Sequence, residues 1–331
     1  RLQWSRQDEF RREPFGPAMS MRITATTDAT GNIQNWQHEV WSPTHSTRPY
    51  YGGDTAGSLL ASREKTEPLE EFNGRNIPHP PGGADRNAVA LYSFPNQRSI
   101  EHYIDDRPLR VSALRGLGAY GNIFAIESFI DELARYAGAD PFEYRLRHLT
   151  NTRAIAVIEA LRELADTTSA ELPDMLQGRG IAFAQYKNLA AYLALMTDIA
   201  IDPESGVIRV LRAYATMDAG RIISPDGARN QIEGGIIQAT SWTLKEAVKN
   251  STSSIESIDW ASYPIIGFDE TPEIKVTLIN NPQLRPLGVG EAAQGPTAAA
   301  IANAVADATG SRLRDLPLTA ERVISALPPA A

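Results

Sequence analysis

The chain has 331 residues, of which 42% are hydrophobic and 22% charged, an ordinary composition for a globular protein long enough for two domains or two packed lobes. Its formal net charge of −8 argues against a nucleic-acid partner, and no apolar run reaches the roughly 18 residues of a membrane span. Because the chain has no cysteine, it forms no disulfide and holds no iron–sulfur cluster through cysteine ligands.

Periodicity and turn residues predict the elements in chain order. Alternating apolar and polar residues over 21–27 and 33–41, with Gly31-Asn32 between them, predict a β-hairpin. Residues 50–95 are rich in proline, glycine and charge, and predict an extended arm that is functional or lies on a partner. Apolar spacing predicts a helix over 122–136, and Asp140-Pro141 predict the cap and first turn of another. The helix that begins at Asp140-Pro141 is predicted to run to about residue 149, and further helices are predicted over 154–164 and 231–248. Strands are predicted over 181–186, 191–201, 207–216 and 274–279. This irregular mixture favours an α+β fold, with mixed sheets and packed helices, over a doubly wound sheet.

One short motif is typical of nucleotide binding. Residues 116–121 read Gly-x-Gly-x-x-Gly, between a possible strand at 109–114 and a helix, which is the context of a dinucleotide-binding loop. That fingerprint also requires a strand ending in an acid about 20 residues later, and here residues 140–145 predict a helix. A nicotinamide-dependent oxidoreductase using Gly116 to Gly121 therefore stands as an alternative.

A second motif lies near the C-terminus, from Gly288 to Thr297. Its one acid, Glu291, follows a Gly-x-Gly turn, and glycines let the backbone bend sharply or approach a ligand closely. Gly295-Pro296 comes next, and Pro296 suits the first position of a helix over about 297–309, whose free amides would form an anion site. An ordinary loop and helix cap would have the same pattern.

The segment 288–310 resembles the C-terminal motif of the molybdopterin-binding subunit of the xanthine oxidase family, in which the acid after the Gly-x-Gly turn is the catalytic base. Other stretches agree in the family's order: 114–118, the arginine–glycine loop beside the metal; 217–220 with 230–235, the pterin-contacting loop and helix; and 263–274, the strand leading into the final loop. Residues 179–188 and 44–49 resemble the branch that includes isoquinoline 1-oxidoreductase. The resemblance implies the C-terminal part of a molybdenum-cofactor-binding domain, with one lobe at 1–150 carrying the arm and a second at 151–331 carrying the Glu291 loop.

The chain departs from the family in one respect. The family's Glu-x-Gly-Gln-Gly loop is absent, and the opening Arg1-Leu2-Gln3-Trp4 reads as the middle of a strand. Together these features predict the second half of a split or cleaved molybdenum subunit, which holds part of the cofactor site.

The resemblance assigns roles to individual residues. Glu291 is the expected catalytic base, and Arg115 supplies positive charge beside the oxygen ligands of the metal. Leu117 stands where purine-oxidising members carry an aromatic ring, so tight clamping of a purine is not expected. The metal is held through the pterin, with no protein ligand, and the cofactor-binding residues are Gly116, Leu117, Gly118, Gln231, Gly288, Gly290, Gln294 and Thr297. A salt bridge to a nearby acid is the alternative for Arg115, and a plain surface position is the alternative for Gln231.

The implied activity is that of a molybdenum hydroxylase that oxidises an N-heteroaromatic compound or an aldehyde, with water as the oxygen source. The implied cofactor is a molybdenum–molybdopterin cytosine dinucleotide, and electrons would pass to [2Fe-2S] clusters on a partner subunit. Expected partners are the first half of the subunit, the iron–sulfur subunit, and a cytochrome or flavin subunit. The enzyme would work in the cytoplasm or at the periplasmic face of the membrane, with the cytoplasm favoured. A non-catalytic half-subunit that binds partners through the arm is a further alternative.

Overall fold

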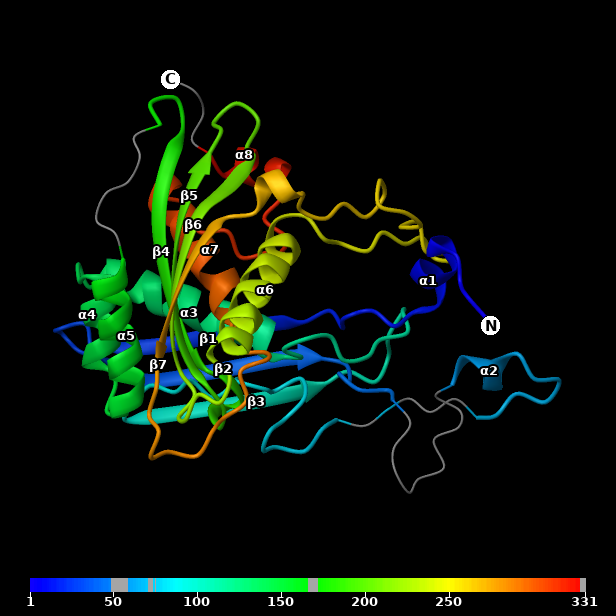
Figure 1. The fold of residues 1–331 in the computed structure, drawn as a ribbon, viewed down its shortest axis with the longest axis horizontal. Helices are drawn as coiled ribbons and strands as arrows, with labels where there is room; N and C mark the ends of the chain where they lie inside the picture. The colour runs from blue at the N-terminus through cyan, green and yellow to red at the C-terminus, as the bar shows by residue number, and fades with distance from the viewer. Residues whose placement is uncertain (49–58, 71–73, 75, 166–171, 328–331) are drawn as a thin grey trace.

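The computed structural model describes residues 1–48, 59–70, 74, 76–165 and 172–327. Pro49 of the 44–49 motif, and residues 50–58, 71–73 and 75 of the predicted arm, lie outside the described residues, as do 166–171 and 328–331. The described chain combines helices with two mixed sheets, which confirms the predicted α+β class (Figure 1).

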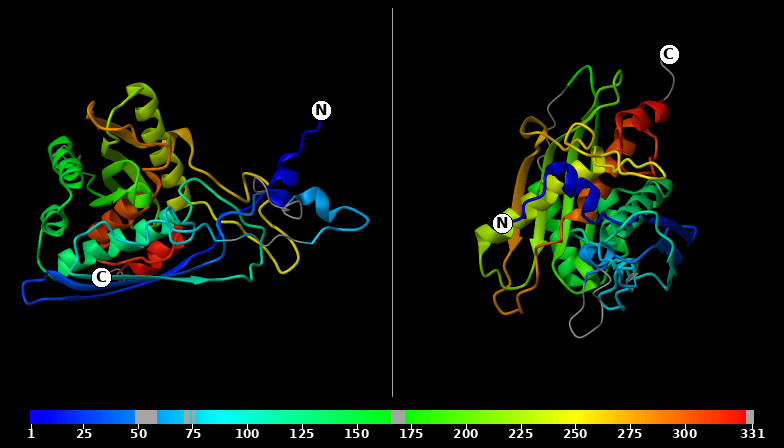
Figure 2. Two further views of the ribbon diagram at one scale, coloured as in Figure 1. Left: turned by 90° about the horizontal axis from the view of Figure 1, so that it is seen from below. Right: turned by 90° about the vertical axis from the view of Figure 1, so that its right-hand side faces the viewer.

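The first sheet contains three strands, β1 (Ser20–Thr27), β2 (Ile33–Ser42) and β3 (Asn96–Tyr103). β2 runs antiparallel to β1 and parallel to β3. The β1–β2 hairpin is as predicted, because the Asp28 carboxylate accepts the backbone N–H groups of Thr30 and Asn32 across the turn. The sheet forms one layer at an edge of the molecule, with helix α3 (Ala119–Tyr136) against it (Figure 2). β3 was not predicted, because its polar sequence shows little alternation.

Three helices follow this sheet close to their predicted positions: α3, α4 (Pro141–Arg147) and α5 (Thr152–Leu164). Asp140 caps α4 by accepting the backbone N–H groups of the second and third helical residues, and Pro141 occupies the first helical position as predicted. Asn151 caps α5 in the same way. Local capping chemistry therefore sets where these helices begin.

The second sheet has the order β4 (Leu176–Gln185), β5 (Tyr192–Ile201), β6 (Ile208–Asp218) and β7 (Glu273–Ile279). Neighbours are antiparallel except for the parallel pair β6 and β7. Every residue of β5 is buried, because α5 and α7 (Gln294–Thr309) both pack against this strand. Glycines in β4 allow α7 to approach closely, and a Cβ on Gly180 would lie 2.2 Å from the carbonyl oxygen of Ala300.

Two helices differ from their predicted bounds. Helix α6 (Pro225–Leu244) begins at a Ser224 cap and Pro225, well before Gln231, and ends earlier than predicted. Helix α7 begins at Gln294, so Pro296 lies within its first turn, and the prediction that Pro296 is the first helical residue is wrong. The small residues of α7 pack against β4 and α3, and this packing extends the helix at its N-terminal end to Gln294. A final helix, α8 (Ala320–Ala326), had no prediction.

Two predicted strands are absent among the described residues. The possible strand at 109–114 contributes a single bridge, between Val111 and Phe15. The opening residues 1–4 are not in a strand either, because Ser5 caps helix α1 (Arg6–Arg12) directly after them. The ring of Phe10 in α1 packs edge-on against Trp260, with the ring centroids 5.5 Å apart, and joins the N-terminus to the 246–267 loop. With α2 (Leu60–Arg63), these segments form the extension on the right of Figure 1.

The core is continuous between the two sheets. One apolar cluster contains both Trp36 of β2 and Tyr214 of β6, and α3 packs against α7. Each sheet falls within one of the predicted lobes, 1–150 and 151–331, and the division into lobes stays a prediction. No helix in the described part of the chain combines the length and apolar character needed to cross a membrane.

Candidate functional site

Arg115 lies where three distant segments meet. Its Nε donates to the carbonyl oxygen of Gly290 at 2.6 Å. Its Nη2 donates to both the backbone oxygen and the side-chain Oε1 of Gln231, each at 3.0 Å. The structure therefore brings together three of the predicted site residues from three separate segments. These bonds go to carbonyl and amide oxygens, so the alternative of a salt bridge does not describe Arg115.

Glu291 faces the same point from the start of α7. Its Oε1 accepts the backbone N–H of Gly116 at 3.0 Å. Gly116 has φ +93°, a left-handed conformation in which glycine has no steric cost. The carboxylate is half-buried, and the next two residues, Ala292 and Ala293, belong to an apolar cluster that Val289 also contacts. Backbone geometry on one side and apolar packing on the other hold this acid in place.

Arg115 and Glu291 interact electrostatically. Burial lowers the pKa of Arg115, and the Glu291 carboxylate opposes that shift. A guanidinium stays protonated in proteins, so Arg115 is a fixed positive charge beside the acid.

Several glutamines surround this pair. Gln238 lies two turns after Gln231 on α6, and its Oε1 accepts from Arg115 Nη1 at 3.4 Å. The Gln294 amide, turned so that both of its ends are satisfied, donates to the Glu291 backbone oxygen at 3.2 Å and accepts from Arg115 Nε at 2.9 Å. Gln231 itself is exposed, with its Oε1 oriented by Arg115. Gln238 was not predicted, although its i+7 spacing from Gln231 on one helix face could have indicated it.

Not all of the predicted backbone donors are free. Gly116 donates to Glu291, Leu117 to the oxygen of Leu114 at 3.0 Å, and Gly118 to the oxygen of Gly83 at 3.1 Å. The start of α3 therefore has no spare amide at these three positions for a phosphate. A Cβ on Gly118 would lie 2.3 Å from the Ala84 oxygen, so this glycine is needed for packing. Leu117 has φ +50°, which is uncommon for a residue with a side chain and is typical of functional loops.

Thr297, assigned by the resemblance to cofactor binding, lies inside the protein. Its hydroxyl donates to the Ala293 oxygen at 2.7 Å, and its side chain is fully buried. In the preceding turn, a Cβ on Gly295 would lie 2.6 Å from Ile123, so the start of α7 is packed against α3. By contrast, a Cβ on Gly288 would meet nothing within 4 Å, and one on Gly290 only Gln231 Oε1 at 3.5 Å. The open side of the site is therefore the Gly288–Gly290 turn.

The nicotinamide alternative does not fit the fold. Its loop requires a strand immediately before it, and the 109–114 segment has only the one bridge at Val111. The element after α3 is helix α4, so no strand ends in an acid at the ribose position. Gly121 lies inside α3 against Met19 and Met21. We therefore discard the dinucleotide-binding interpretation of Gly116 to Gly121.

A second loop group, at the end of the 179–188 stretch, borders the acid. The 3-10 turn η2 (Tyr186–Asn188) follows β4, and Lys187 and Asn188 have φ +61° and +53°. Asn87 holds this turn: its Nδ2 donates to the Gln185 oxygen at 2.8 Å and its Oδ1 accepts the Lys187 N–H at 2.8 Å. Asn188, the last residue of this turn, donates from Nδ2 to the Val89 oxygen at 2.8 Å.

The donor groups suit an organic ligand. Among the described residues, no three His, Cys, Asp or Glu side chains gather to bind a metal ion. What this region offers instead is one guanidinium, three glutamine amides and an exposed glycine turn, the groups that hydrogen-bond planar heterocyclic edges and phosphates. A pterin that itself carries the metal fits this donor set.

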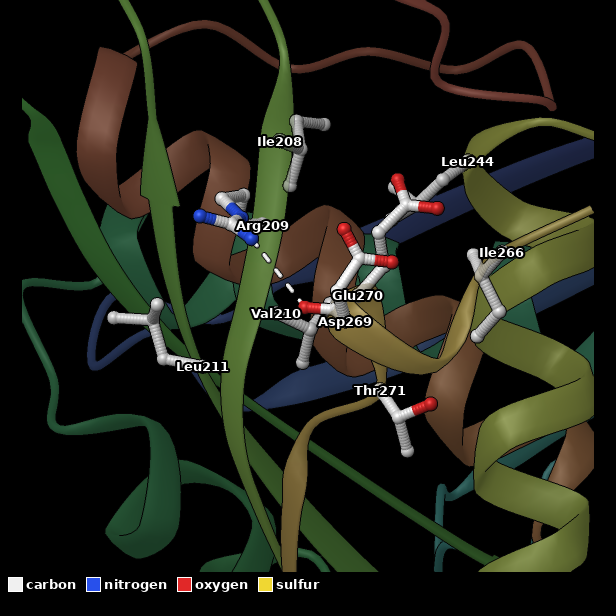
Figure 3. Close-up of a pocket in the computed structure, with 9 residues that line it drawn as sticks. All are labelled: Ile208, Arg209, Val210, Leu211, Leu244, Ile266, Asp269, Glu270 and Thr271. Atoms are coloured by element: carbon white, nitrogen blue, oxygen red, sulfur yellow. Dashed lines mark hydrogen bonds between the residues drawn. The ribbon is translucent and has the colours of Figure 1, made fainter.

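A separate hollow of about 150 Å³ lies at the start of β6 (Figure 3). It is lined by residues 208–211, by Leu244 and Ile266, and by 269–271, the end of η3 (Phe268–Glu270) and the residue after it. Arg209, one of the lining residues, donates from Nη2 to the Asp269 oxygen at 3.3 Å. It shares no residue with the Arg115–Glu291 site, and its side chains supply no convergent set of donors.

Comparison with known proteins agrees with the donor chemistry. Residues 125–272 match the molybdopterin cofactor-binding domain family. Over 99% of its length the chain is 38% identical to a component of nicotinate dehydrogenase from Pseudomonas putida, and over 95% it is 30% identical to the beta subunit of isoquinoline 1-oxidoreductase from Brevundimonas diminuta. The chain spans 27% and 38% of the lengths of these two relatives.

Solved structures show the same fold. Quinoline 2-oxidoreductase from Pseudomonas putida 86 superposes with a TM-score of 0.77 at 15% identity, covering 98% of this chain and 64% of that chain. Aldehyde oxidoreductase from Desulfovibrio gigas gives a TM-score of 0.76 at 15% identity, covering 98% and 51%. The resemblance to molybdopterin-binding subunits predicted from the sequence is confirmed.

Proposed function

We propose that this chain, whose residues 125–272 match a molybdopterin cofactor-binding domain, forms one part of the active site of a molybdenum hydroxylase. The reaction replaces a C–H bond of the substrate by C–OH, takes its oxygen from water and releases two electrons and two protons. The observation that supports this most is the convergence of Arg115, Gly290 and Glu291 beside the glutamines of α6.

An N-heteroaromatic ring is the substrate class that we favour over an aldehyde. The two relatives above are named for nicotinate and isoquinoline, and one of the structural neighbours for quinoline. All three names denote rings that contain nitrogen, whose neighbouring carbon is electron-poor. Leu117 supplies no aromatic face at this site, so the ring would be held by shape and by polar groups rather than by stacking on that residue.

Glu291 serves as the base. When bound, the molybdenum cofactor accepts the two electrons of the oxidation. The chain supplies a carboxylate whose Oε1 accepts the Gly116 N–H, and lone pairs remain on the carboxylate to take a proton. Arg115 places a fixed positive charge beside the acid and fixes the turn before it through the bond to the Gly290 oxygen.

The glutamines hold the organic part of the cofactor. Gln231, Gln238 and Gln294 present amides around the Arg115 guanidinium, and the exposed Gly288–Gly290 turn allows close approach of a planar edge. We extend the proposal to the cytosine dinucleotide form of the cofactor and to [2Fe-2S] clusters on a partner, because this chain has no cysteine to ligate them. The remainder of the molybdenum subunit, and a cytochrome or flavin subunit, complete the proposed complex. The compartment, cytoplasm or periplasmic face, stays a prediction.

Glu291→Gln tests the function. Gln keeps the size and the acceptor for Gly116 but cannot take a proton, so the rate of enzyme reduction by substrate should fall about 10²–10⁴-fold while the molybdenum content is unchanged. Glu159→Gln, an exposed change on α5, serves as the matched control and should keep the wild-type rate. A metal-loaded Glu291→Gln enzyme that is reduced at close to the control rate would refute the assignment, and a variant without metal would make Glu291 a structural residue.

A further inference from the structure

Tyr186 is a buried phenol that the proposed reaction does not yet use. It lies at the end of β4 in the turn η2, and only 3% of it is exposed. Its hydroxyl oxygen accepts a hydrogen bond from Arg86 Nη1 at 2.8 Å. Because a guanidinium only donates, the phenol proton is left to point toward another acceptor.

Arg86 cannot turn away from this phenol. Its Nε and Nη2 both donate to the Gly82 oxygen, at 3.1 Å and 2.7 Å, and the residue is 5% exposed. The same loop fixes the start of α3, since the Gly118 N–H donates to the Gly83 oxygen and Asn122 Nδ2 to the Ala84 oxygen. The 82–86 loop is therefore a common support for the phenol and for the Gly116 turn.

The loop that carries Glu291 lies against the turn that carries the phenol. The 186–191 turn is held against the Glu291 loop, because the Tyr186 N–H donates to the Ala191 oxygen and the Ala191 N–H to the Gly288 oxygen. Tyr186, Ala292 and Ala293 share one apolar cluster. Burial raises the pKa of Tyr186, the Arg86 cation opposes the rise, and the Glu291 carboxylate adds to it.

We propose that Tyr186, held by Arg86, is a positioning residue that donates its phenolic hydrogen to Glu291 and aims this carboxylate at the cofactor. The inference rests on the proposed function, in which Glu291 is the base. The Gly116 N–H comes from the loop before α3 and the phenol from the end of β4, so two donors on separate elements fix one rotamer of the acid. A carboxylate has about four acceptor positions, so lone pairs remain for the proton that the reaction transfers.

Three cations lie near the phenol and the acid. Lys187 Nζ lies 5.1 Å and Arg86 Cζ 5.7 Å from the centroid of the Tyr186 ring, and Arg115 stands beside Glu291. These cations remain in a Tyr186→Phe variant, so the variant removes one neutral donor from the acid and leaves the charges in place. A donor to the ionised form favours that form, and its loss makes protonation of the acid easier.

The test uses Tyr186→Phe, Glu291→Gln and the double variant in the enzyme purified with its partners. Tyr144→Phe is the matched control, because its phenol is equally buried and donates to the Gly31 oxygen at 2.8 Å, on α4 and away from Glu291. We expect Tyr186→Phe to keep its molybdenum, to lose about tenfold in kcat with little change in KM, and to move the acid limb of the pH–rate profile up by about one pH unit. Tyr144→Phe should change neither kcat nor the profile.

A second readout does not depend on turnover. Urea midpoints of the wild type, Tyr186→Phe, Glu291→Gln and their double variant form one double-mutant cycle, and Tyr144→Phe with its own Glu291→Gln double variant completes a second. We expect Tyr186→Phe and Glu291→Gln to be coupled and Tyr144→Phe and Glu291→Gln to be additive. An additive Tyr186–Glu291 cycle would overturn the inference, and so would a coupled cycle with an unmoved pH profile, because Tyr186 would then only support the fold. If Glu291→Gln abolishes turnover and Tyr186→Phe changes nothing, the inference alone fails. If a loaded Glu291→Gln enzyme stays active, the proposed function fails and the inference with it.

Discussion

Glu127→Gln should destabilise the protein far more than its conservative chemistry suggests. Glu127 and Arg145 form a buried ion pair between α3 and α4, with side chains 1% and 0% exposed and Arg145 Nε 2.9 Å from Glu127 Oε2. Burial alone lowers the pKa of Arg145, but Glu127 and its neighbours outweigh this and the net shift is upward. Removal of one partner leaves the other charge buried without compensation, which typically costs about 3–5 kcal/mol.

The surroundings of the carboxylate support a value in that range. Glu127 Oε1 accepts the Tyr92 hydroxyl at 2.7 Å, and Oε2 accepts the Phe183 N–H at 2.9 Å. A glutamine can keep the bond from Phe183 and offer its amide to Tyr92, so the loss comes mainly from the missing charge. Bulk water does not reach the Arg145 guanidinium to solvate it instead, because Arg145 is fully buried between α3, α4 and β4.

The matched control is Glu132→Gln, the same change five positions later on α3. Glu132 pairs with Arg314 at 3.0 Å, but these side chains are 38% and 61% exposed. Exposed pairs contribute about 0–1 kcal/mol, so this variant should unfold close to the wild type. The assay is the urea midpoint of the same unfolding transition in both variants, because a protein of this size need not unfold in two states. Equal midpoints for Glu127→Gln and Glu132→Gln would refute the reasoning.

Two further predictions concern stability. His38 is fully buried, and burial lowers its pKa to about 4 from 6.5, a shift that the neighbouring Asn122 side chain opposes. Between these two pKa values only the unfolded chain binds the proton, so the free energy of unfolding should fall by up to about 3 kcal/mol as the pH drops through this window. The decline should be shallower in His38→Gln. An equal slope of urea midpoint against pH in both proteins would contradict this. Gly180→Ala should cost about 3 kcal/mol or more, since its Cβ would lie 2.2 Å from the Ala300 oxygen and 2.3 Å from the Ala304 nitrogen. Gly234→Ala on α6, where a Cβ meets nothing within 4 Å, should instead stabilise by up to about 1 kcal/mol, and thermal unfolding that ranks these two variants the other way would rule out the packing argument.

Local signals predicted much of the fold because they act within a few residues. The Asp140 cap and Pro141 determine the start of α4, and the Gly31 turn closes the first hairpin, both as the sequence indicates. Errors arose where packing over long distances decided the outcome. Helix α7 extends to Gln294 because its first turn packs against α3, and the apolar run at 109–114 finds only one bridge.

The candidate site was partly predictable. Glu291, Arg115 and Gln231 were identified by their motifs, and the structure brings them together. The hydroxyl of Thr297, however, points into its own helix, and the amides of 116–118 are used inside the chain. Tyr186 lies in the 179–188 stretch, but the sequence analysis assigned it no role of its own, because its contact with Arg86 joins residues 100 positions apart.

The sequence by itself determined the class of the fold, the order of the motifs and the residue types that carry the chemistry, because capping, periodicity and motif spacing are written within short stretches of chain. Only the tertiary structure decided which of these groups meet. Arg115 and Gly290 are 175 residues apart, and their contact depends on the packing of α3 against α7 and of α7 against β4. Such contacts depend on the shapes of side chains at interfaces between elements, such as the glycines of β4 under α7, and no single stretch of sequence contains both partners of an interface.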